Sequence, residues 1–311
     1  MTFDDIIPAT MKAIRLHPPG GVDAIAFDEI ATPTPGDGEV LVRVHAAALT
    51  RDELTWSLDR LPAIPSYELS GTVVAAGAST FGSGEAVYAL TDFGRDGVAA
   101  EYAAVPAAAL SPKPDSLSHV EAAAVPLPAL SAMQGLFDHG RLARNERVLI
   151  HGGAGGVGAY AVRLARLHGA YVMATASAAR VATAYELGAD EVIDHETADF
   201  TTIAPVDVVF DTAGGDRLQR SVQVLKPGGR LVSIAGNPPL AECEKAGIEG
   251  SYFVVAPNPG QLEDVTRLFD QGLLQVLVDR TYPLVEAREA FRHLQEAGGR
   301  GKVVLRVADE R

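Results

Sequence analysis

The sequence predicts an α/β protein that combines a β-rich domain with a domain built on a doubly wound parallel sheet. Three observations support this prediction. Short strand-like runs broken by Gly and Pro fill residues 11–117, strand-like and helical runs alternate from Arg147 onward, and 311 residues give room for two hydrophobic cores. Hydrophobic residues make up 47% and charged residues 21% of the chain, which is typical of a soluble globular protein.

The β-rich part reads as antiparallel strands with one buried face. In residues 40–45, valines occupy every second position, which is the period of a half-buried strand. Residues 1–10 lack such a pattern, so we expect a flexible N-terminal extension there. Gly- and Pro-rich turns separate the expected strands, which are KAIRLH, AIAFDEI, VLVRVHAAAL, SGTVVAAG, EAVYAL and EYAAVP.

From residue 119 onward the pattern changes to helices and then to alternating strands and helices. Residues 119–140 read as helical segments interrupted by Pro126 and Pro128. We expect helices at Gly156–His168, before Gly188, before the turn KPGG and at QLEDVTRLFDQGLL. Strands are expected at VLIHG, YVMATA, EVID, VDVVFD and RLVSIAG, with GSYFVV as a candidate sixth. This alternation implies parallel strands joined by right-handed crossovers.

The end of the chain resembles its beginning. A helix in AREAFRHLQEAGG leads into GKVVLRV, a strand more like those of the first part than those of the second. We therefore expect the chain to return to its first domain. The predicted domains are residues 11–118 with 277–311, and residues 119–276.

Composition excludes several classes of function. A formal net charge of -14 and a pI of about 5.0 argue against a nucleic-acid partner, because phosphate binding needs clustered cations. The single cysteine, Cys243, cannot build a disulfide framework or a cysteine-rich zinc site. No apolar stretch is long enough for a membrane helix, and the N-terminus lacks a basic, apolar leader, so we expect a cytoplasmic protein.

A glycine motif lies between an expected strand and an expected helix. Gly153, Gly155 and Gly158 fill a GxGxxG frame at this position. The first glycine permits the tight turn, the second lets backbone approach a pyrophosphate, and the third allows close packing of helix and strand. Amides at the helix N-terminus then hold the phosphates. The motif predicts a dinucleotide site, and the alternative is a glycine-rich turn without a ligand.

The second strand of this unit ends without an acidic residue. In NAD-specific sites an Asp or Glu about 20 residues after the motif holds the ribose 2′-hydroxyl. Here no acid occurs between Gly153 and Glu186, whereas Ser177 can donate a hydrogen bond and Arg180 can supply positive charge to a 2′-phosphate. The predicted cofactor is therefore NADP(H). The alternative for Arg180 is an ordinary solvated helix residue.

Several motifs together resemble those of a known family. They are IPSYELSGTVVAAG, EAVYAL, GVAAEYAAVP, LSPKPDSLSHVEAAAVPLPALSAMQGL, HGGAGGVG with GADEVIDH, FDTAGG, LKPGGRLVSIAG and the terminal GKVVL. From Met11 to its end the chain resembles the zinc-independent quinone oxidoreductases, the zeta-crystallin-like branch of the medium-chain dehydrogenase/reductase superfamily. The resemblance implies a GroES-like catalytic domain, a Rossmann domain that binds NADPH, and a homodimer.

The resemblance also implies which residues contact the cofactor. Relatives bind the pyrophosphate at the glycine turn, the 2′-phosphate after the second strand, and the rest of the dinucleotide at later turns. Carried over to this chain, these positions are Ser131, Gly153, Ala154, Gly155, Gly156, Val157, Gly158, Ser177, Arg180, Thr212, Ala213, Gly214, Gly236, Phe253, Val254 and Lys302. His195 stands where relatives often have a Tyr, and its alternative is a plain strand-end residue.

The ligands that metal-dependent relatives use are missing. Those relatives bind zinc through a Cys after the third strand, the His of a Gly-His-Glu motif and a later Cys. This chain has LTRDEL at the first place, Tyr67 in place of the His and no cysteine at the third place. A catalytic zinc needs three protein ligands, so we expect no metal.

Without a metal, hydride transfer needs an acceptor that can spread the incoming charge. A quinone or an α,β-unsaturated carbonyl such as an enone or enal does so, and it needs only a nearby hydrogen-bond donor and a proton. Tyr67, Thr50 and Arg51 are the candidate catalytic residues, and the alternative for Tyr67 is core packing. Trp56 and Phe93 are candidates for a wall against a flat substrate, or for core. Two other functions remain open: an enoyl-thioester reductase, and a cofactor-binding structural or regulatory protein.

Overall fold

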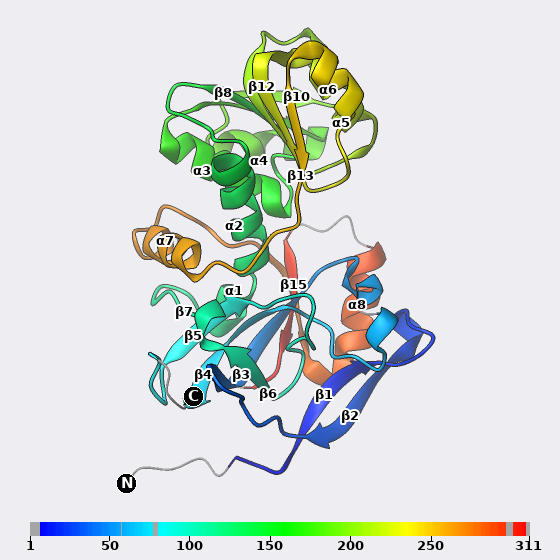
Figure 1. Cartoon of the computed structure of the whole chain (residues 1–311), viewed down its shortest axis with the longest axis vertical. Coiled ribbons are helices and arrows are strands. Elements are labelled where there is room, and N and C mark those ends of the chain that lie inside the picture. The colour runs from blue at the N-terminus through cyan, green and yellow to red at the C-terminus, as the bar shows by residue number, and fades with distance from the viewer. Residues whose placement is uncertain (1–6, 57, 77–79, 297–300, 309–311) are drawn as a thin grey trace. The chain divides into compact units, whose positions relative to one another are not determined.

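The computed structural model describes residues 7–56, 58–76, 80–296 and 301–308 (Figure 1). The chain divides into two compact units, one formed by Met1–Leu127 with Ala256–Arg311 and the other by Pro128–Val255. A mixed sheet dominates the first unit and a parallel sheet the second, which confirms the predicted fold class. The predicted domain limits, at residues 118/119 and 276/277, stay a prediction. The expected extension at residues 1–10 lies largely outside the described residues.

The first unit is built on a seven-stranded sheet. Strand order is β14-β15-β3-β4-β5-β7, with β6 paired to β3, and a separate hairpin joins β1 to β2. The strands are β1 (Thr10–Leu16), β2 (Ile25–Ala31), β3 (Glu39–Leu49), β4 (Glu68–Ala75), β5 (Ala86–Leu90), β6 (Tyr102–Pro106), β7 (Ser111–Pro112), β14 (Val278–Pro283) and β15 (Lys302–Arg306). Strand β15 pairs antiparallel with β3, as Val303 lies opposite Leu49. The chain therefore returns to its first sheet, as the sequence predicts.

Three α-helices pack in the described part of this unit. They are α1 (His119–Ala123), α7 (Pro259–Asp270) and α8 (Ala287–Glu296). A capping box between Ser118 and Glu121 starts α1, and the hydroxyl of Tyr88 donates to the carbonyl of Leu262 in α7 at 2.8 Å. Helix α8 buries Phe291 in one hydrophobic core of the unit. Short 3-10 turns complete it: η1 (Val22–Ala24), η2 (Glu53–Thr55), η3 (Leu58–Arg60), η4 (Ala107–Ala109) and η9 (Leu284–Glu286).

The second unit is a six-stranded parallel sheet flanked by helices (Figure 1). Its order is β10-β9-β8-β11-β12-β13, the doubly wound order in which the chain reverses direction between β8 and β11. The strands are β8 (Arg147–His151), β9 (Tyr171–Ala176), β10 (Glu191–Asp194), β11 (Val206–Asp211), β12 (Leu225–Ser233) and β13 (Glu249–Tyr252). Strand β13 confirms the candidate sixth strand, although it ends before Phe253.

The helices of this unit include the expected one after the glycine motif. They are α2 (Pro126–Met133), α3 (Gly156–His168), α4 (Val181–Glu186), α5 (Gly215–Arg220) and α6 (Leu240–Ala246), with a π-helical turn η5 (Gln134–His139). Short turns η6 (Ala178–Arg180), η7 (Phe200–Thr202) and η8 (Ser221–Val224) connect them. Helix α3 has the predicted bounds and ends at Gly169, whose φ of 91° is the left-handed conformation that glycine adopts easily.

Two local predictions were wrong, and two elements were missed. Pro128 does not interrupt a helix, because it lies in the first turn of α2, where backbone N–H groups lack helical partners. The KPGG segment lies within β12 at a register irregularity, and α5 ends before it. Helix α6 and strand β14 were not expected. The described residues contain no helix long and apolar enough to span a bilayer.

Candidate cofactor and substrate site

The glycine turn connects β8 directly to α3. Backbone N–H of Gly153 donates to the Thr175 carbonyl at 2.9 Å, which anchors the turn to β9. A Cβ on Gly158 would overlap the carbonyl oxygen of Gly152, and one on Gly153 would lie 2.6 Å from the Cβ of Ala174. A Cβ on Gly156 would meet nothing within 4 Å. Positions 153 and 158 therefore require glycine. The space next to Gly156, at the N-terminus of α3, is open for an anionic group.

A buried histidine supports this turn from below. His151 is fully buried at the end of β8, and its Nδ1 and Nε2 lie 3.2 Å from Thr175 Oγ1 and 3.0 Å from Ser221 Oγ. Ser221 Oγ already donates to the Arg217 carbonyl, so it accepts from Nε2–H, and Thr175 Oγ1 donates to Nδ1. Thr175 Oγ1 in turn accepts from the Gly152 N–H at 3.2 Å.

The protonation state of His151 follows from its burial. Desolvation, with repulsion from Arg217 and His195, lowers the pKa of His151 to about 3. The ring is therefore neutral at physiological pH, with one nitrogen donating and the other accepting. A neutral ring satisfies both hydroxyls without bringing an unpaired charge beneath the turn.

A second turn, after β11, lies beside the glycine turn. Thr212 Oγ1 donates to the His151 carbonyl at 2.7 Å. Buried Asp211 accepts from Gly214 N–H at 3.0 Å and from Ser233 Oγ at 2.9 Å, so it fixes the turn at Thr212–Gly214. Sequence reasoning did not single out Asp211. Its place at the carboxyl end of a buried strand, directly before the TAGG turn, was the available signal.

Ser177 and Arg180 follow the end of β9. Ser177 stands at the N-cap of η6 without a capping bond from its side chain, and Arg180 Nη1 donates to the carbonyl of Ala154 at 3.3 Å. The structure thus brings Arg180 to the glycine turn, 26 residues earlier in the chain. The segment that follows β9 therefore places a guanidinium, and no carboxylate, next to the glycine turn.

A pocket of about 390 Å³ opens next to the Thr212–Gly214 turn. The predicted residues Ala213 and Gly214 line it, together with His195, Phe200 and Arg217. Arg220, which also lines it, is paired with Asp199 at 2.6 Å. Small residues, an aromatic ring and polar edges suit a flat heteroaromatic group such as an adenine.

The other predicted cofactor residues of this unit are less clearly grouped. Ser131 is buried in α2, and Gly236 follows β12 with a φ of 155°. Phe253 is buried, and its ring stacks on His139 with centroids 4.3 Å apart, whereas Val254 is exposed. Packing against His139 already accounts for the position of the Phe253 ring.

In the first unit, three strands bring a charged cluster together. Because β15 and β4 both pair with β3, Lys302 and Glu68 begin their strands next to Thr50, which follows β3. Lys302 Nζ donates to Thr50 Oγ1 at 3.0 Å and forms a short ion pair with Glu68. Glu53, in the turn after Thr50, accepts from the Thr50 N–H at 3.0 Å. This acid was also missed, because no pattern in the residues around Glu53 indicates that its side chain is buried.

The remaining candidates lie in two different surroundings. Tyr67 is buried, and its ring packs against Trp56 and Phe93 at centroid distances of 5.8 and 5.2 Å. Trp56 and Phe93 are partly exposed and contact each other edge to face. Arg51 lies on the surface. These three aromatic rings thus form one cluster, in which Tyr67 has the buried position.

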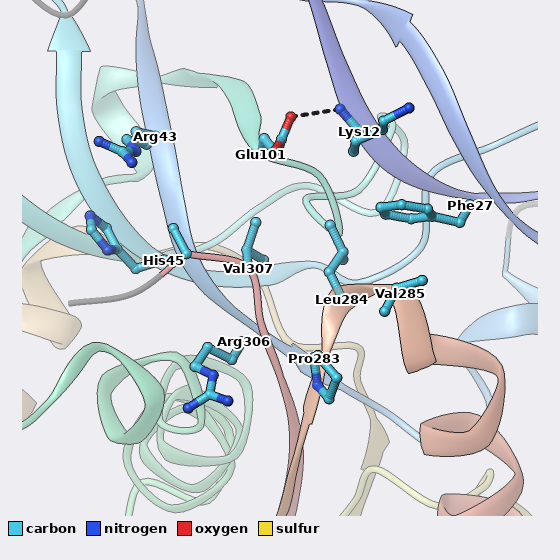
Figure 2. A pocket seen from close by; sticks show the side chains of 11 residues that line it. Lys12, Phe27, Arg43, His45, Glu101, Pro283, Leu284, Val285, Arg306 and Val307 are labelled. Carbon is cyan, nitrogen blue, oxygen red and sulfur yellow. Dashed lines mark hydrogen bonds between the residues drawn. The ribbon is translucent and has the colours of Figure 1, made fainter.

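A larger hollow of about 820 Å³ lies elsewhere in the first unit (Figure 2). Figure 2 shows the basic side chains of Lys12, Arg43, His45 and Arg306 around it. Glu101 also lines it, and its carboxylate accepts from the Lys12 backbone N–H at 2.7 Å. None of the predicted site residues lines this hollow.

Comparison with known proteins gives the chain its family. Residues 36–115 match the alcohol dehydrogenase GroES-like domain, and residues 187–305 match a family described as zinc-binding dehydrogenase. A probable zinc-binding oxidoreductase, mitochondrial, of Arthroderma benhamiae is 31% identical over 97% of this chain and 98% of its own. The chain belongs to the medium-chain dehydrogenase/reductase superfamily.

Two further members of the superfamily are similar along most of their length. An NADPH-dependent alkenal/one oxidoreductase, chloroplastic, of Arabidopsis thaliana is 31% identical over 98% of this chain and 82% of its own. The structure of the quinone oxidoreductase from Coxiella burnetii matches with a TM-score of 0.88 and 29% identity, over 96% of this chain and 100% of that one. The resemblance to quinone oxidoreductases of the superfamily is confirmed, and the chain is an oxidoreductase that uses a nicotinamide cofactor.

The names of some superfamily members imply zinc. The donor set of this chain does not fit zinc: the segment LTRDEL has no cysteine, Tyr67 stands in place of the expected histidine, and Tyr67 is packed among aromatic rings. Within the described part of the chain, no three His, Cys, Asp or Glu side chains gather into a metal-binding group. A zinc-free reaction stays a prediction, and no step below is routed through a metal.

The nicotinamide cofactor of the superfamily, by contrast, fits the residues present. The space above Gly156 and the N-terminus of the 13-residue helix α3 suit a pyrophosphate, and the adjoining pocket suits an adenosine. These features belong to the second unit. The Thr50, Glu68 and Lys302 cluster belongs to the first.

Proposed function

We propose that this protein is an NADPH-dependent reductase that transfers hydride to a quinone or to the activated C=C bond of an α,β-unsaturated carbonyl, without a metal. The observation that carries the choice of NADPH is Arg180. Its guanidinium borders the glycine turn through the carbonyl of Ala154, where an NAD-specific site would have a carboxylate. The names of the Arabidopsis and Coxiella relatives support the substrate class.

In this proposal the second unit holds the cofactor. Amides at the start of α3 bind the pyrophosphate, Ser177 and Arg180 bind the 2′-phosphate, and the pocket beside Ala213 and Gly214 takes the adenosine. The other residues of this unit proposed to contact the cofactor are Ser131, Thr212, Gly236, Phe253 and Val254. Lys302 is the proposed cofactor residue of the first unit.

The first unit supplies the groups that act on the substrate. A bound nicotinamide cofactor supplies the hydride, and negative charge then develops on the substrate oxygen. Lys302, held by Glu68 and Thr50, is a fixed cation suited to stabilise that charge. Thr50, Tyr67 and Arg51 remain the candidates for the hydrogen bond or proton that the oxygen needs.

The cofactor assignment is tested by binding. Arg180→Ala should weaken NADPH binding about tenfold or more and leave NADH binding unchanged, because a charge-assisted bond to phosphate is worth about 1.5–3 kcal/mol. Isothermal titration calorimetry with both coenzymes measures this. Lys245→Ala, which removes an exposed cation of the same unit, is the matched control. Equal affinity of the wild type for NADH and NADPH would sink the assignment.

The reaction is tested by turnover. NADPH consumption, followed by absorbance, is compared for a simple quinone, an enal and an enoyl thioester, beside an alcohol with NADP. Turnover of the quinone or enal supports the proposal, and preference for the thioester supports the enoyl-thioester alternative. Tight NADPH binding without turnover supports a structural or regulatory role. Assembly as a homodimer and a cytoplasmic location stay predictions, and analytical ultracentrifugation tests the first.

A further inference from the structure

Two buried carboxyl groups share one ammonium group in the first unit. Glu53 and Glu68 are 2% and 1% exposed, and Lys302 is the cation that acts on both. The carboxyl group of Glu68 is fully used: one oxygen pairs with Lys302, and the other accepts from the Leu127 N–H at 2.9 Å. Lys302 therefore compensates one carboxylate, and that carboxylate is Glu68.

Glu53 is left with an incomplete set of partners. Its Oε2 accepts from the Thr50 N–H at 3.0 Å. Its Oε1 is buried and has no hydrogen-bond partner among the residues that the structure describes. A buried carboxylate with one oxygen unsatisfied and its nearest cation already paired is costly, because desolvation of the charge is not offset.

The surroundings of Glu53 favour its uncharged form. Burial raises the pKa of Glu53 to about 8, and the charge of Glu68 acts in the same direction. Lys302 on β15 and the hydrogen bond from the Thr50 N–H oppose the rise without cancelling it, and the Ser66 N–H, which is near the carboxyl group but makes no hydrogen bond of normal geometry with it, opposes it least. Burial raises the pKa of Glu68 as well, but the ion pair with Lys302 and the hydrogen bond from the Leu127 N–H stabilise its charged form. Glu53 has only the Thr50 N–H as a hydrogen-bond donor, so Glu53 is the member of this pair that keeps its proton at neutral pH.

We propose that Glu53 is a positioning residue of the reductase: as an uncharged acid it holds Thr50, and through Thr50 it keeps the ammonium of Lys302 in place. This inference rests on the proposed function for its effect on turnover. Two hydrogen bonds link these residues: the Thr50 N–H donates to Glu53 Oε2, and Lys302 Nζ donates to Thr50 Oγ1.

Ionisation of Glu53 changes the balance around Lys302. A second carboxylate then competes with Glu68 and Thr50 for the same ammonium, since opposite charges attract strongly in a buried environment. Lys302 is held less well for the oxygen of the substrate. The activity should therefore fall as the pH rises through about 8, the pKa of Glu53.

The pH profile of kcat/KM tests the effect on turnover. In the wild type we expect kcat/KM at pH 9 to be about tenfold below its value at neutral pH, because one pH unit above its pKa about a tenth of Glu53 is still protonated. Glu53→Gln keeps an acceptor for the Thr50 N–H but cannot ionise, so it should retain activity at pH 9. Glu53→Ala should lose activity at every pH. Asp52→Asn removes an exposed carboxylate one residue away and should leave the wild-type profile unchanged.

A second measurement is independent of turnover. The amide resonance of Thr50 in a ¹⁵N–¹H spectrum reports on the bond to Glu53, and in the wild type it should titrate with a midpoint near pH 8. The infrared band of a protonated carboxylic acid should disappear over the same range. Glu53→Gln should abolish both changes.

The outcomes separate the two proposals. A Thr50 resonance that does not titrate in the wild type, or a band that is absent at neutral pH, overturns the inference even if the protein is an active reductase. A titrating Thr50 with the same alkaline loss of activity in Glu53→Gln also overturns it. Titration of Thr50 in a protein that reduces neither quinone nor enal supports the role of Glu53 in holding Thr50 and rejects the proposed function.

Discussion

The two units stabilise their buried polar side chains in different ways. Beneath the glycine turn, His151 is neutral and both of its nitrogens have hydroxyl partners, while the carboxylate of Asp211 accepts from backbone and hydroxyl donors. Around Lys302, two carboxyl groups surround one cation and one oxygen of Glu53 has no described partner. The first arrangement fixes a backbone shape. The second leaves a group that can change its charge near neutral pH.

The largest expected effect comes from a substitution that disrupts the glycine turn. Gly158→Ala places a Cβ on the carbonyl oxygen of Gly152, so either the turn or the start of α3 must shift. We expect NADPH binding to fall at least 100-fold and the free energy of unfolding to fall by about 2–4 kcal/mol. Calorimetry and urea unfolding measure the two.

Gly156→Ala is the matched control, because a Cβ there meets nothing within 4 Å of the protein. It should fold with wild-type stability. Equal stability of the two variants would contradict the packing role assigned to Gly158.

The next effect tests the charged arrangement. Lys302→Met leaves two buried carboxyl groups without their cation, and removing one partner of a buried pair costs about 3–5 kcal/mol. Urea unfolding at neutral pH should show that loss. The double variant Lys302→Met with Glu68→Leu should recover much of the loss, since no unpaired charge then remains. Failure to recover would mean that packing, and not charge, sets the cost.

The smallest expected effect is on how the free energy of unfolding depends on pH. The pKa of Glu53 is raised from 4.5 to about 8 in the folded state, so its contribution to stability is present at low pH and is lost as the pH rises toward 8. The pKa values of His119 and His151 are lowered from 6.5 to about 4 and about 3, so their contribution is lost as the pH falls below 6.5. Between pH 6.5 and 8, Glu53 is therefore the one of these three groups whose protonation changes the free energy of unfolding.

Stability should therefore decline by about 1–2 kcal/mol between pH 6.5 and 8 in the wild type. Urea unfolding at several pH values in this range measures the slope. In Glu53→Gln most of the slope should be lost, and Glu68, whose pKa burial also raises, accounts for any remainder; the loss below pH 6.5 should remain. An unchanged slope in Glu53→Gln would assign it to another group.

Local patterns in the sequence were enough to predict the second unit in outline. Strand β8, the glycine turn and helix α3 follow one another within about 20 residues, and each has a strong signal of its own. Pro128 was misjudged because the rule that proline breaks a helix does not apply to a first turn. Helix α6 escaped notice because it has only seven residues and little apolar periodicity.

The charged cluster of the first unit could not be predicted in the same way. Lys302 and Thr50 are 252 residues apart in the chain and meet only through the pairing of β15 with β3. Single-sequence patterns carry no register between distant strands. The burial of Glu53 follows from that pairing and from the 3-10 turn after Thr50. The sequence of residues 52–54, DEL, indicates neither of them.

The pairing of β15 also matters for how the protein is made on the ribosome. The second unit is continuous in sequence, so all of its strands are available once Val255 has been synthesised. The sheet of the first unit has β15 between β14 and β3, and it stays incomplete until Arg306 has emerged. Strand β6 covers one half of this edge of β3, at Glu39–Arg43, but the half at Ala46–Leu49 pairs only with β15. During translation that half of β3 therefore lacks its neighbour until nearly the end of synthesis, and its edge is exposed to wrong partners for most of that time.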